Sequence, residues 1–366
     1  MTQENPKAFK LWISAEIAKK YFLNTSLSAK DLKKILAQLN KLELRARVQL
    51  IATELKNILP ENFPKALQQL MIIVRQQEMK SFELWPATEF IQMYGLNHID
   101  ESLAAMYELT RKFTAEFSIR PFINSYGDRI YEKLEQWKSD HNEHIRRWLS
   151  EGTRPRLPWG EKLHAAVKDP KRGLRILDHL KFDPSLYVRK SVSNHLNDIS
   201  KDHPDLVIKT LQQWQKQLPK NYQKEFDFIC NRALRTLIKK GHPGTLQFLG
   251  IDLNKSSVKC SDFKINKTKF KMNEELRLEL SLKNQTLQPL KFVVDYVIYF
   301  KKANGALNPK VFKLKKGFLP PQARINFAKK YSFKPITTRK YHGGEHQIAI
   351  QVNGHEIKRL RFDLKV

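Results

Sequence analysis

Hydrophobic residues recur at helical spacing over the first two thirds of this 366-residue chain. Between about residues 15 and 250 they return every three or four positions, with polar residues between them, as in Leu67, Leu70, Met71 and Val74. This period places the apolar side chains on one face of an α-helix. Prolines such as Pro60 interrupt the stretches where helices are expected to end. The pattern therefore predicts an all-helical region built of helix pairs with short connections.

One sequence frame recurs within this region. It reads D-x-x-x-x-[IV]-R, and it occurs twice with a separation of 43 positions, as Asp140, Ile145 and Arg146 and as Asp183, Val188 and Arg189. A period of 43 residues with two helices per unit fits a HEAT-type repeat, which stacks into a curved solenoid with a concave face. We expect the Asp and Arg of this frame to cap helices and to bridge neighbouring units.

The pattern changes near Gly250. Apolar and polar residues alternate in Leu276–Leu280, Phe292–Phe300 and Ile348–Val352, and turn dipeptides such as Asn304-Gly305 separate the runs. Such short alternating runs are typical of strands in an immunoglobulin-like β-sandwich. The predicted fold is therefore mainly α: a HEAT-like α-α solenoid over residues 1–252, followed by an all-β Ig-like sandwich over residues 253–366.

The net charge of the chain limits the classes of molecule that it is expected to bind. The formal net charge is +29, which favours a polyanion such as nucleic acid or an acidic membrane surface, although a lysine excess that serves solubility remains an alternative. Residues 251–366 carry 25 Lys or Arg and only 9 Asp or Glu. Between Tyr296 and Lys340 there are 12 basic residues and no acid. Nucleic acid is the partner that this distribution favours.

Other features exclude several classes of protein. Two cysteines, Cys230 and Cys260, are too few for a disulfide framework or a cysteine-rich zinc site. No apolar run reaches the ~18 residues of a membrane span, and the first residues lack the apolar core of a signal peptide. The sequence contains no P-loop, no G-x-G-x-x-G, no H-E-x-x-H and no G-x-S-x-G motif. We expect a soluble protein of a reducing cytoplasm, and the missing motifs disfavour nucleotide hydrolysis, hydride transfer and metal chemistry.

Three acidic residues are candidates for chemistry. Glu116, Glu151 and Asp198 each lie at or near an expected helix end, where stacked repeats can bring them to one face. A carboxylate there can orient a water molecule or stabilise a nearby cation. The more common alternative for each acid is a solvated surface residue or a helix cap.

The stretch around Glu151 also holds cations and a large ring. Arg147, Arg154 and Arg156 can bind phosphates in a bidentate manner. Trp159 follows Leu157-Pro158, and it is either a packing anchor or a flat platform for a base or a cation. The size of the ring favours the anchor.

Several long segments, LELRARVQLIATEL, LWPATEFIQMYGL, SLAAMYELTRKFTAEFSIRPFI, NEHIRRWLSEGTRPRLPW and LYVRKSVSNHLNDISKDHPD, go beyond these spacings. Together they resemble the AlkC branch of the AlkC/AlkD-type DNA alkylation repair glycosylases. The resemblance covers roughly residues 10–250, and the strand-rich tail is similar to that of members with a C-terminal Ig-like domain. It implies a monofunctional glycosylase that hydrolyses the N-glycosidic bond of cationic alkylated bases, such as 3-methyladenine and 3-methylcytosine, in duplex DNA.

The resemblance also implies roles for particular residues. Glu116 and Glu151 are expected to be catalytic carboxylates near the deoxyribose, Asp198 to position water, and Trp159 to contact the lesion nucleotide. The candidates for contacts with the DNA backbone, or for structural contacts, are Arg147, Arg154, Arg156 and Lys190. The implied enzyme acts in the bacterial cytoplasm without a metal or a cofactor, and it holds bent duplex DNA along the concave face, with the basic sandwich clasping the DNA. Such a clasp can work as a monomer. The alternative is a non-catalytic HEAT-repeat scaffold that binds or senses damaged DNA, and such a scaffold has no need of all three acids.

Overall fold

The computed structural model describes residues 13–23, 25–251, 253–337 and 339–366. The chain divides into two compact units. One comprises the described residues up to Asp202 together with Gln213–Ala233, and the other comprises His203–Gln212 together with Leu234–Val366. The helix α14 (Pro204–Lys216) begins in the second unit and ends in the first.

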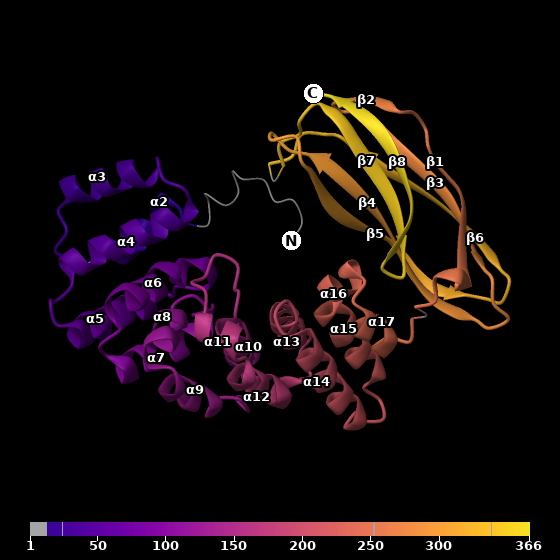
Figure 1. Ribbon diagram of the computed structural model, residues 1–366. Coiled ribbons are helices and arrows are strands. Elements are labelled where there is room, and N and C mark those ends of the chain that lie inside the picture. The colour runs from indigo at the N-terminus through magenta and orange to yellow at the C-terminus, as the bar shows by residue number, and fades with distance from the viewer. Residues whose placement is uncertain (1–12, 24, 252, 338) are drawn as a thin grey trace. The chain divides into compact units, whose positions relative to one another are not determined.

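The first unit consists of helices joined by short connections (Figure 1). They are α2 (Ala15–Phe22), α3 (Ala29–Leu39), α4 (Leu44–Ile58), α5 (Phe63–Gln76), α6 (Trp85–Tyr94), α7 (Ile99–Thr110), α8 (Ile119–Tyr126), α9 (Asp128–Glu135), α10 (Glu143–Gly152), α11 (His164–Lys168), α12 (Lys171–Leu180), α13 (Leu186–Ile199) and α15 (Gln223–Ala233), with the 3-10 helix η1 (Ser81–Leu84) before α6. The predicted stripe of Leu67, Leu70, Met71 and Val74 lies on α5 and is buried. Helix α10 packs against α13, and α13 packs against α15.

The repeated Asp and Arg join neighbouring units of the helical region, as expected. Asp140 accepts a hydrogen bond from the backbone N–H of Asn142, and Asp183 accepts one from Ser185, so that each Asp shapes the turn before its helix. Arg146 donates to both carboxylate oxygens of Asp183, over 2.6 and 3.1 Å. The same guanidinium donates to the carbonyl oxygen of Asp140, so one side chain links two repeats. The bridge between repeats is thus confirmed, but Asn142 and Ser185, rather than the two aspartates, cap α10 and α13.

The second unit carries the strands, preceded by α16 (Arg235–Lys240), α17 (Pro243–Phe248) and the 3-10 helix η2 (Lys255–Ser257). The strands are β1 (Val258–Ile265), β2 (Lys269–Lys271), β3 (Glu275–Asn284), β4 (Leu290–Lys301), β5 (Leu307–Leu319), β6 (Arg324–Ser332), β7 (Gly344–Val352) and β8 (His355–Lys365). They form a three-stranded sheet in the order β1-β3-β6 and a five-stranded sheet in the order β2-β8-β7-β4-β5. The pairs are antiparallel except for β2 with β8.

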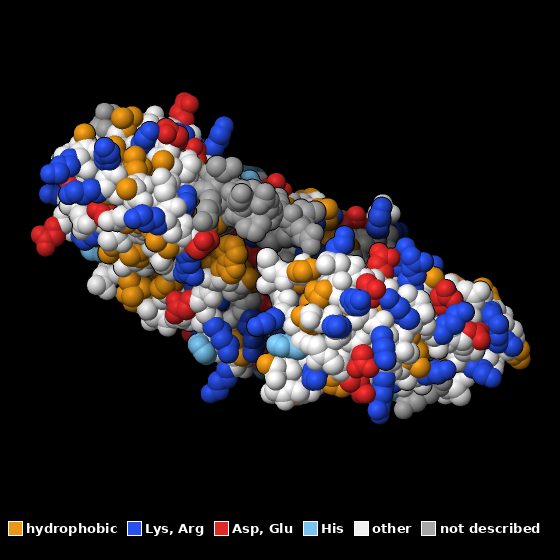
Figure 2. Space-filling model, turned by 90° about the horizontal axis from the view of Figure 1, so that it is seen from above, with side chains coloured by type: hydrophobic (Ala, Val, Ile, Leu, Met, Phe, Trp, Pro, Cys, Tyr) orange, Lys and Arg blue, Asp and Glu red, His pale blue; other side chains and the backbone are white. Residues whose placement is uncertain are grey.

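One apolar core lies between these two sheets. Alternate residues of β3 and β4, such as Leu278 and Ile298, are buried in it together with Phe333 and Phe362. The opposite side of β4 is also covered, since Val293 packs with Leu246 of α17 and with Ile251. A helical region followed by a C-terminal Ig-like sandwich is therefore confirmed as the fold. Figure 2 shows many lysine and arginine side chains on one face of the sandwich, with fewer acidic ones between them.

None of the described helices is long and apolar enough to cross a bilayer.

Candidate active site

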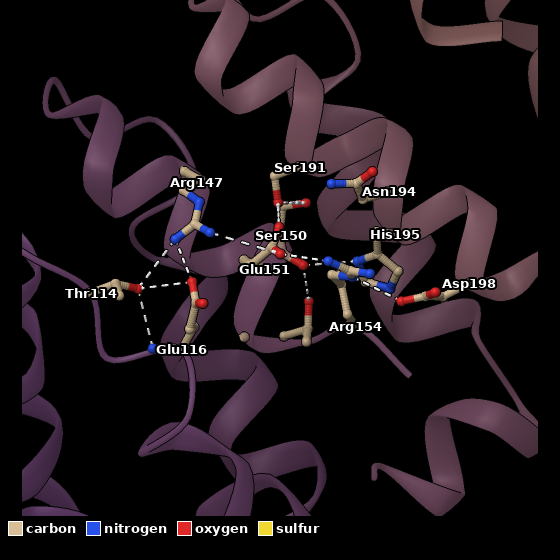
Figure 3. Close-up of polar contacts among 12 residues, drawn as sticks. Thr114, Glu116, Arg147, Ser150, Glu151, Arg154, Ser191, Asn194, His195 and Asp198 are labelled. Atoms are coloured by element: carbon tan, nitrogen blue, oxygen red, sulfur yellow. Dashed lines mark hydrogen bonds and ion pairs between the residues drawn. The ribbon is translucent and has the colours of Figure 1, made fainter. Parts of the chain in front are cut away.

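The three acidic residues singled out in the sequence lie in one row of alternating charge (Figure 3). Glu116 precedes α8, Glu151 lies in the last turn of α10, and Asp198 lies near the end of α13. Arg147 stands between the first two acids, and Arg154 stands between the second and the third. Packing of α10 against α13 brings together Glu151 and Asp198, which lie 47 positions apart in the chain. Arg147 joins Glu116, 35 positions before Glu151, to the same row.

Glu116 is buried but has one oxygen without a partner among the described residues. Its Oε2 accepts hydrogen bonds from Nη1 of Arg147 and from Oγ1 of Thr114. Its Oε1 accepts no hydrogen bond from a described residue. Burial raises the pKa of Glu116 above its ordinary value, the nearby Glu151 adds to this rise, and Arg147 opposes it. Glu116 therefore combines a carboxylate oxygen available for bonding with a raised affinity for protons.

Glu151 is held on both oxygens. Nη1 of Arg154 donates to Oε1 and the hydroxyl of Ser191 donates to Oε2, each over 2.5 Å, and Nη2 of Arg147 lies 3.8 Å from Oε1. Burial disfavours ionisation of Glu151, but Arg154 and Arg147 outweigh it and hold the pKa below its ordinary value. The two neighbouring carboxylates thus have pKa values shifted in opposite directions, which is the arrangement that separates proton-transfer and charge-stabilising roles.

Asp198 is also held on both oxygens. Nε of Arg154 donates to Oδ2 and Nζ of Lys201 donates to Oδ1, both over 2.8 Å, and the residue is 2% exposed. His195 is buried one turn earlier, and Nδ1 of its ring lies 2.9 Å from the carbonyl oxygen of Ser150. Burial lowers the pKa of His195 to about 4, so the imidazole is neutral at physiological pH.

Trp159 lies on the loop after α10 and is 64% exposed. The expectation of a packing anchor, which followed from the size of the ring, is therefore wrong. The backbone of Trp159 adopts φ +66, a left-handed conformation that is uncommon for a bulky residue. Nη1 of Arg45, on α4, donates to the carbonyl oxygen of Trp159 over 2.7 Å.

The four cations expected to contact DNA have different surroundings. Arg147 and Arg154 are bound to the acids described above, and the guanidinium of Arg147 also lies over the ring of Tyr187, 5.0 Å from its centroid. Arg156 makes a bidentate contact with Asp202. Lys190 is exposed on α13. Lys190 therefore faces solvent, whereas the guanidinium groups of the three arginines are bound to carboxylates.

Sequence reasoning missed Ser191, Lys201 and Arg45. Ser191 precedes Asp198 by seven positions, which is two helical turns, so the helix period places both on the same face. Lys201 follows Asp198 by three positions, a spacing that also joins side chains on a helix. Arg45 is 114 positions from Trp159, and no local pattern connects them.

No group of three or more His, Cys, Asp or Glu side chains able to hold a metal ion occurs in the described ranges. The donor set of this site is instead a row of carboxylates that arginines and a lysine neutralise.

Comparison with known proteins identifies the family. The family described as the C-terminal Ig-like domain of the uncharacterised protein YhaZ matches residues 259–366. The uncharacterised protein YhaZ of Bacillus subtilis strain 168 is 35% identical over 324 residues, which is 88% of each chain. The structure of the Pseudomonas fluorescens alkylpurine DNA glycosylase AlkC, bound to DNA containing an abasic site analogue, covers 98% of this chain and 99% of its own, with 33% identity and a TM-score of 0.88.

The chain belongs to the AlkC family. The resemblance seen in the helical segments is thereby confirmed, and it extends through the strands, because the AlkC match covers nearly the whole chain. This AlkC-family member is of the form that carries a C-terminal Ig-like domain.

Proposed function

We propose that this protein is a monofunctional DNA glycosylase that hydrolyses the N-glycosidic bond of cationic alkylated bases, of the 3-methyladenine and 3-methylcytosine type, in duplex DNA. The activity named for the Pseudomonas fluorescens relative supports this proposal. The observation that carries it is the row of Glu116, Glu151 and Asp198, in which one carboxylate keeps an oxygen available while the other two are fixed by cations.

The chemistry asks little of an acid catalyst. When the bond between C1′ and the base nitrogen breaks, its electron pair moves onto the cationic base, which leaves as a neutral molecule. Positive charge develops on the sugar as an oxocarbenium ion, as in glycoside hydrolysis. A water oxygen then bonds to C1′ and loses a proton, and the products are the free base and an abasic site. A site for this reaction needs negative charge near the sugar and a proton acceptor for the water.

Glu116 is the acid that best suits the water. Its available Oε1 and its raised pKa support the role of proton acceptor, because a base whose pKa lies closer to the working pH transfers protons more effectively. This assignment replaces the sequence-based expectation that Asp198 positions the water. Asp198 bonds to Arg154 and Lys201 through both oxygens, so its proposed role is to orient Arg154.

Glu151 is the acid that best suits the developing cation. Its lowered pKa keeps it ionised, and the hydrogen bonds to Arg154 and Ser191 fix its position before the substrate arrives. A preorganised charge of this kind stabilises a transition state without reorganisation during the reaction. Arg147 and Arg154 would then set the geometry of the acids, and the exposed Lys190 and the basic sandwich would supply the grip on the phosphate backbone.

The test is base release from duplex DNA that carries methylated bases, measured under single-turnover conditions for the wild type and for Glu116→Gln, Glu151→Gln and Asp198→Asn. Each amide variant keeps the shape of the side chain and removes its charge. We expect release of 3-methyladenine or 3-methylcytosine by the wild type, the largest loss of rate for Glu116→Gln, and retained affinity for the same DNA in all variants. A wild type that binds this DNA and releases no base would refute the enzyme and favour a damage-sensing scaffold.

A further inference from the structure

Trp159 presents its ring to solvent from a backbone conformation that a bulky residue rarely adopts. The ring is 64% exposed, whereas Trp85, Trp148 and Trp214 are buried. Water disfavours so large an exposed apolar surface, and φ +66 disfavours a residue with a Cβ atom. Because both preferences oppose this arrangement, contacts around the loop must impose it.

A buried arginine holds both ends of the loop after α10. Arg120, on α8, donates to the carbonyl oxygens of Gly152 and Glu161, which flank Trp159 on both sides. The next residue, Gly160, lies so close to Arg120 that a Cβ atom would stand 3.1 Å from Cδ of the arginine. Arg120 thus holds the base of the loop, but none of its hydrogen bonds reaches Trp159 itself.

Arg45 makes the contact at Trp159. Its Nη1 donates to the carbonyl oxygen of Trp159 over 2.7 Å, from α4, which lies far away in the sequence. The charge of Arg45 also acts on Glu89, a buried carboxylate on α6. Glu89 accepts a hydrogen bond from Gln49, one turn after Arg45 on α4. Arg45 therefore lies close enough to Glu89 for its charge to act on this buried carboxylate, while its Nη1 bonds to the carbonyl oxygen of Trp159.

This contact accounts for sequence segments that the proposed chemistry does not use. Arg45 and Gln49 belong to LELRARVQLIATEL, Glu89 belongs to LWPATEFIQMYGL, and Trp159 ends SEGTRPRLPW. The first two segments supply none of the acids of the candidate active site. One of their polar residues, Arg45, bonds directly to the loop that carries Trp159.

We propose that Arg45 is a positioning residue that holds Trp159 as a preformed, exposed platform for the lesion nucleotide, and that Glu89 holds Arg45 in place. This inference rests on the proposed function only in naming the lesion nucleotide as the group that Trp159 contacts. The position of the ring in the free protein is a separate property, and it can be measured without DNA.

The first measurement is quenching of tryptophan emission by acrylamide in the DNA-free protein. Trp159→Phe defines the part of the accessible emission that belongs to Trp159. We expect Arg45→Met to lose at least half of that part, Arg45→Lys to keep most of it, and Glu89→Gln to fall between them. The matched control is Arg75→Met, which removes an exposed arginine of α5 that pairs with Glu108 of α7. Its emission should be quenched as in the wild type. Equal quenching of Arg45→Met and the wild type would overturn the proposal.

The second measurement is single-turnover base release together with DNA affinity as a function of salt. We expect Arg45→Met to slow release about tenfold, Arg75→Met to stay within twofold of the wild type, and Arg45→Met to add no further loss in a Trp159→Ala background. The dependence of affinity on salt should be unchanged. A decrease of the slope by about 0.9 would instead make Arg45 a phosphate contact and overturn the proposal. If the wild type releases no base, the proposed function fails, and the quenching result still decides the role of Arg45.

Discussion

Removal of Arg154 tests whether the row of charges is an electrostatically balanced core. Arg154 is buried and bonds to two buried carboxylates, Glu151 and Asp198. Arg154→Met keeps an unbranched apolar side chain and removes the charged guanidinium. Breaking a buried ion pair from one side costs about 3–5 kcal/mol, because the remaining charge is left without compensation. Since Ser191 and Lys201 remain bound to the two acids, we expect a loss of about 3 kcal/mol in the free energy of unfolding.

The control lies two residues further along the same loop. Arg156 forms a bidentate pair with Asp202, but both side chains are about 30% exposed. Arg156→Met removes the same charge and the same number of hydrogen bonds to carboxylate oxygens, but from a single partner in a solvated site, so its cost should be below about 1 kcal/mol. Urea unfolding followed by far-UV circular dichroism measures both variants. Equal costs for Arg154→Met and Arg156→Met would refute the reasoning.

The pH dependence of this difference provides a second check. The pKa of Glu151 is lowered in the folded protein, so its contribution to stability is present above its ordinary pKa and is lost as the pH falls through the lowered value. Arg154→Met removes the main cause of the lowering, and in the variant the buried Glu151 takes up a proton more readily. The gap between the wild type and Arg154→Met should therefore be widest near neutral pH and should narrow in acid. A gap that widens in acid would contradict the ion-pair explanation.

Three further results are expected. The single-turnover rate of base release should rise with pH through the raised pKa of Glu116, because only the ionised carboxylate accepts the proton of water, and the pH profile of Glu116→Gln should lack this rise. Trp159→Gly should leave the free energy of unfolding unchanged or raise it by about 1 kcal/mol, because glycine adopts a left-handed backbone without strain. The same variant should slow base release at least tenfold. A clear loss of stability in urea would mean that the ring packs against the protein. Lys190→Ala should lower the slope of log affinity against log salt concentration by about 0.9. Lys315→Ala combined with Lys329→Ala should lower this slope further if the sandwich binds the phosphate backbone. An unchanged slope in a binding assay would exclude these contacts.

The fold was predictable because its signals are local. The apolar stripe of α5 and the alternation of β3 and β4 follow directly from the periods of helix and strand. The repeated Asp and Arg were also predictable, because each bonds within its own repeat or to the next one. The grouping of α16 and α17 with the strands was not, since it depends on contacts such as that of Leu246 with Val293, 47 positions away.

The site shows where local reasoning stops. The sequence indicated the acids correctly as a group at helix ends, but it suggested arginines that face phosphates, and the structure has two of them bound inside the protein. Their role depends on burial: in a dry site Arg147 and Arg154 are needed to keep Glu116, Glu151 and Asp198 from repelling one another. Trp159 illustrates the opposite case, because its ring stays exposed against the usual tendency of a large ring to bury itself, and Arg45 bonds to its backbone carbonyl oxygen. In both cases at least one bonding partner lies 30 or more positions away, so a residue type and its neighbours in the sequence predict that it matters but not every group it serves.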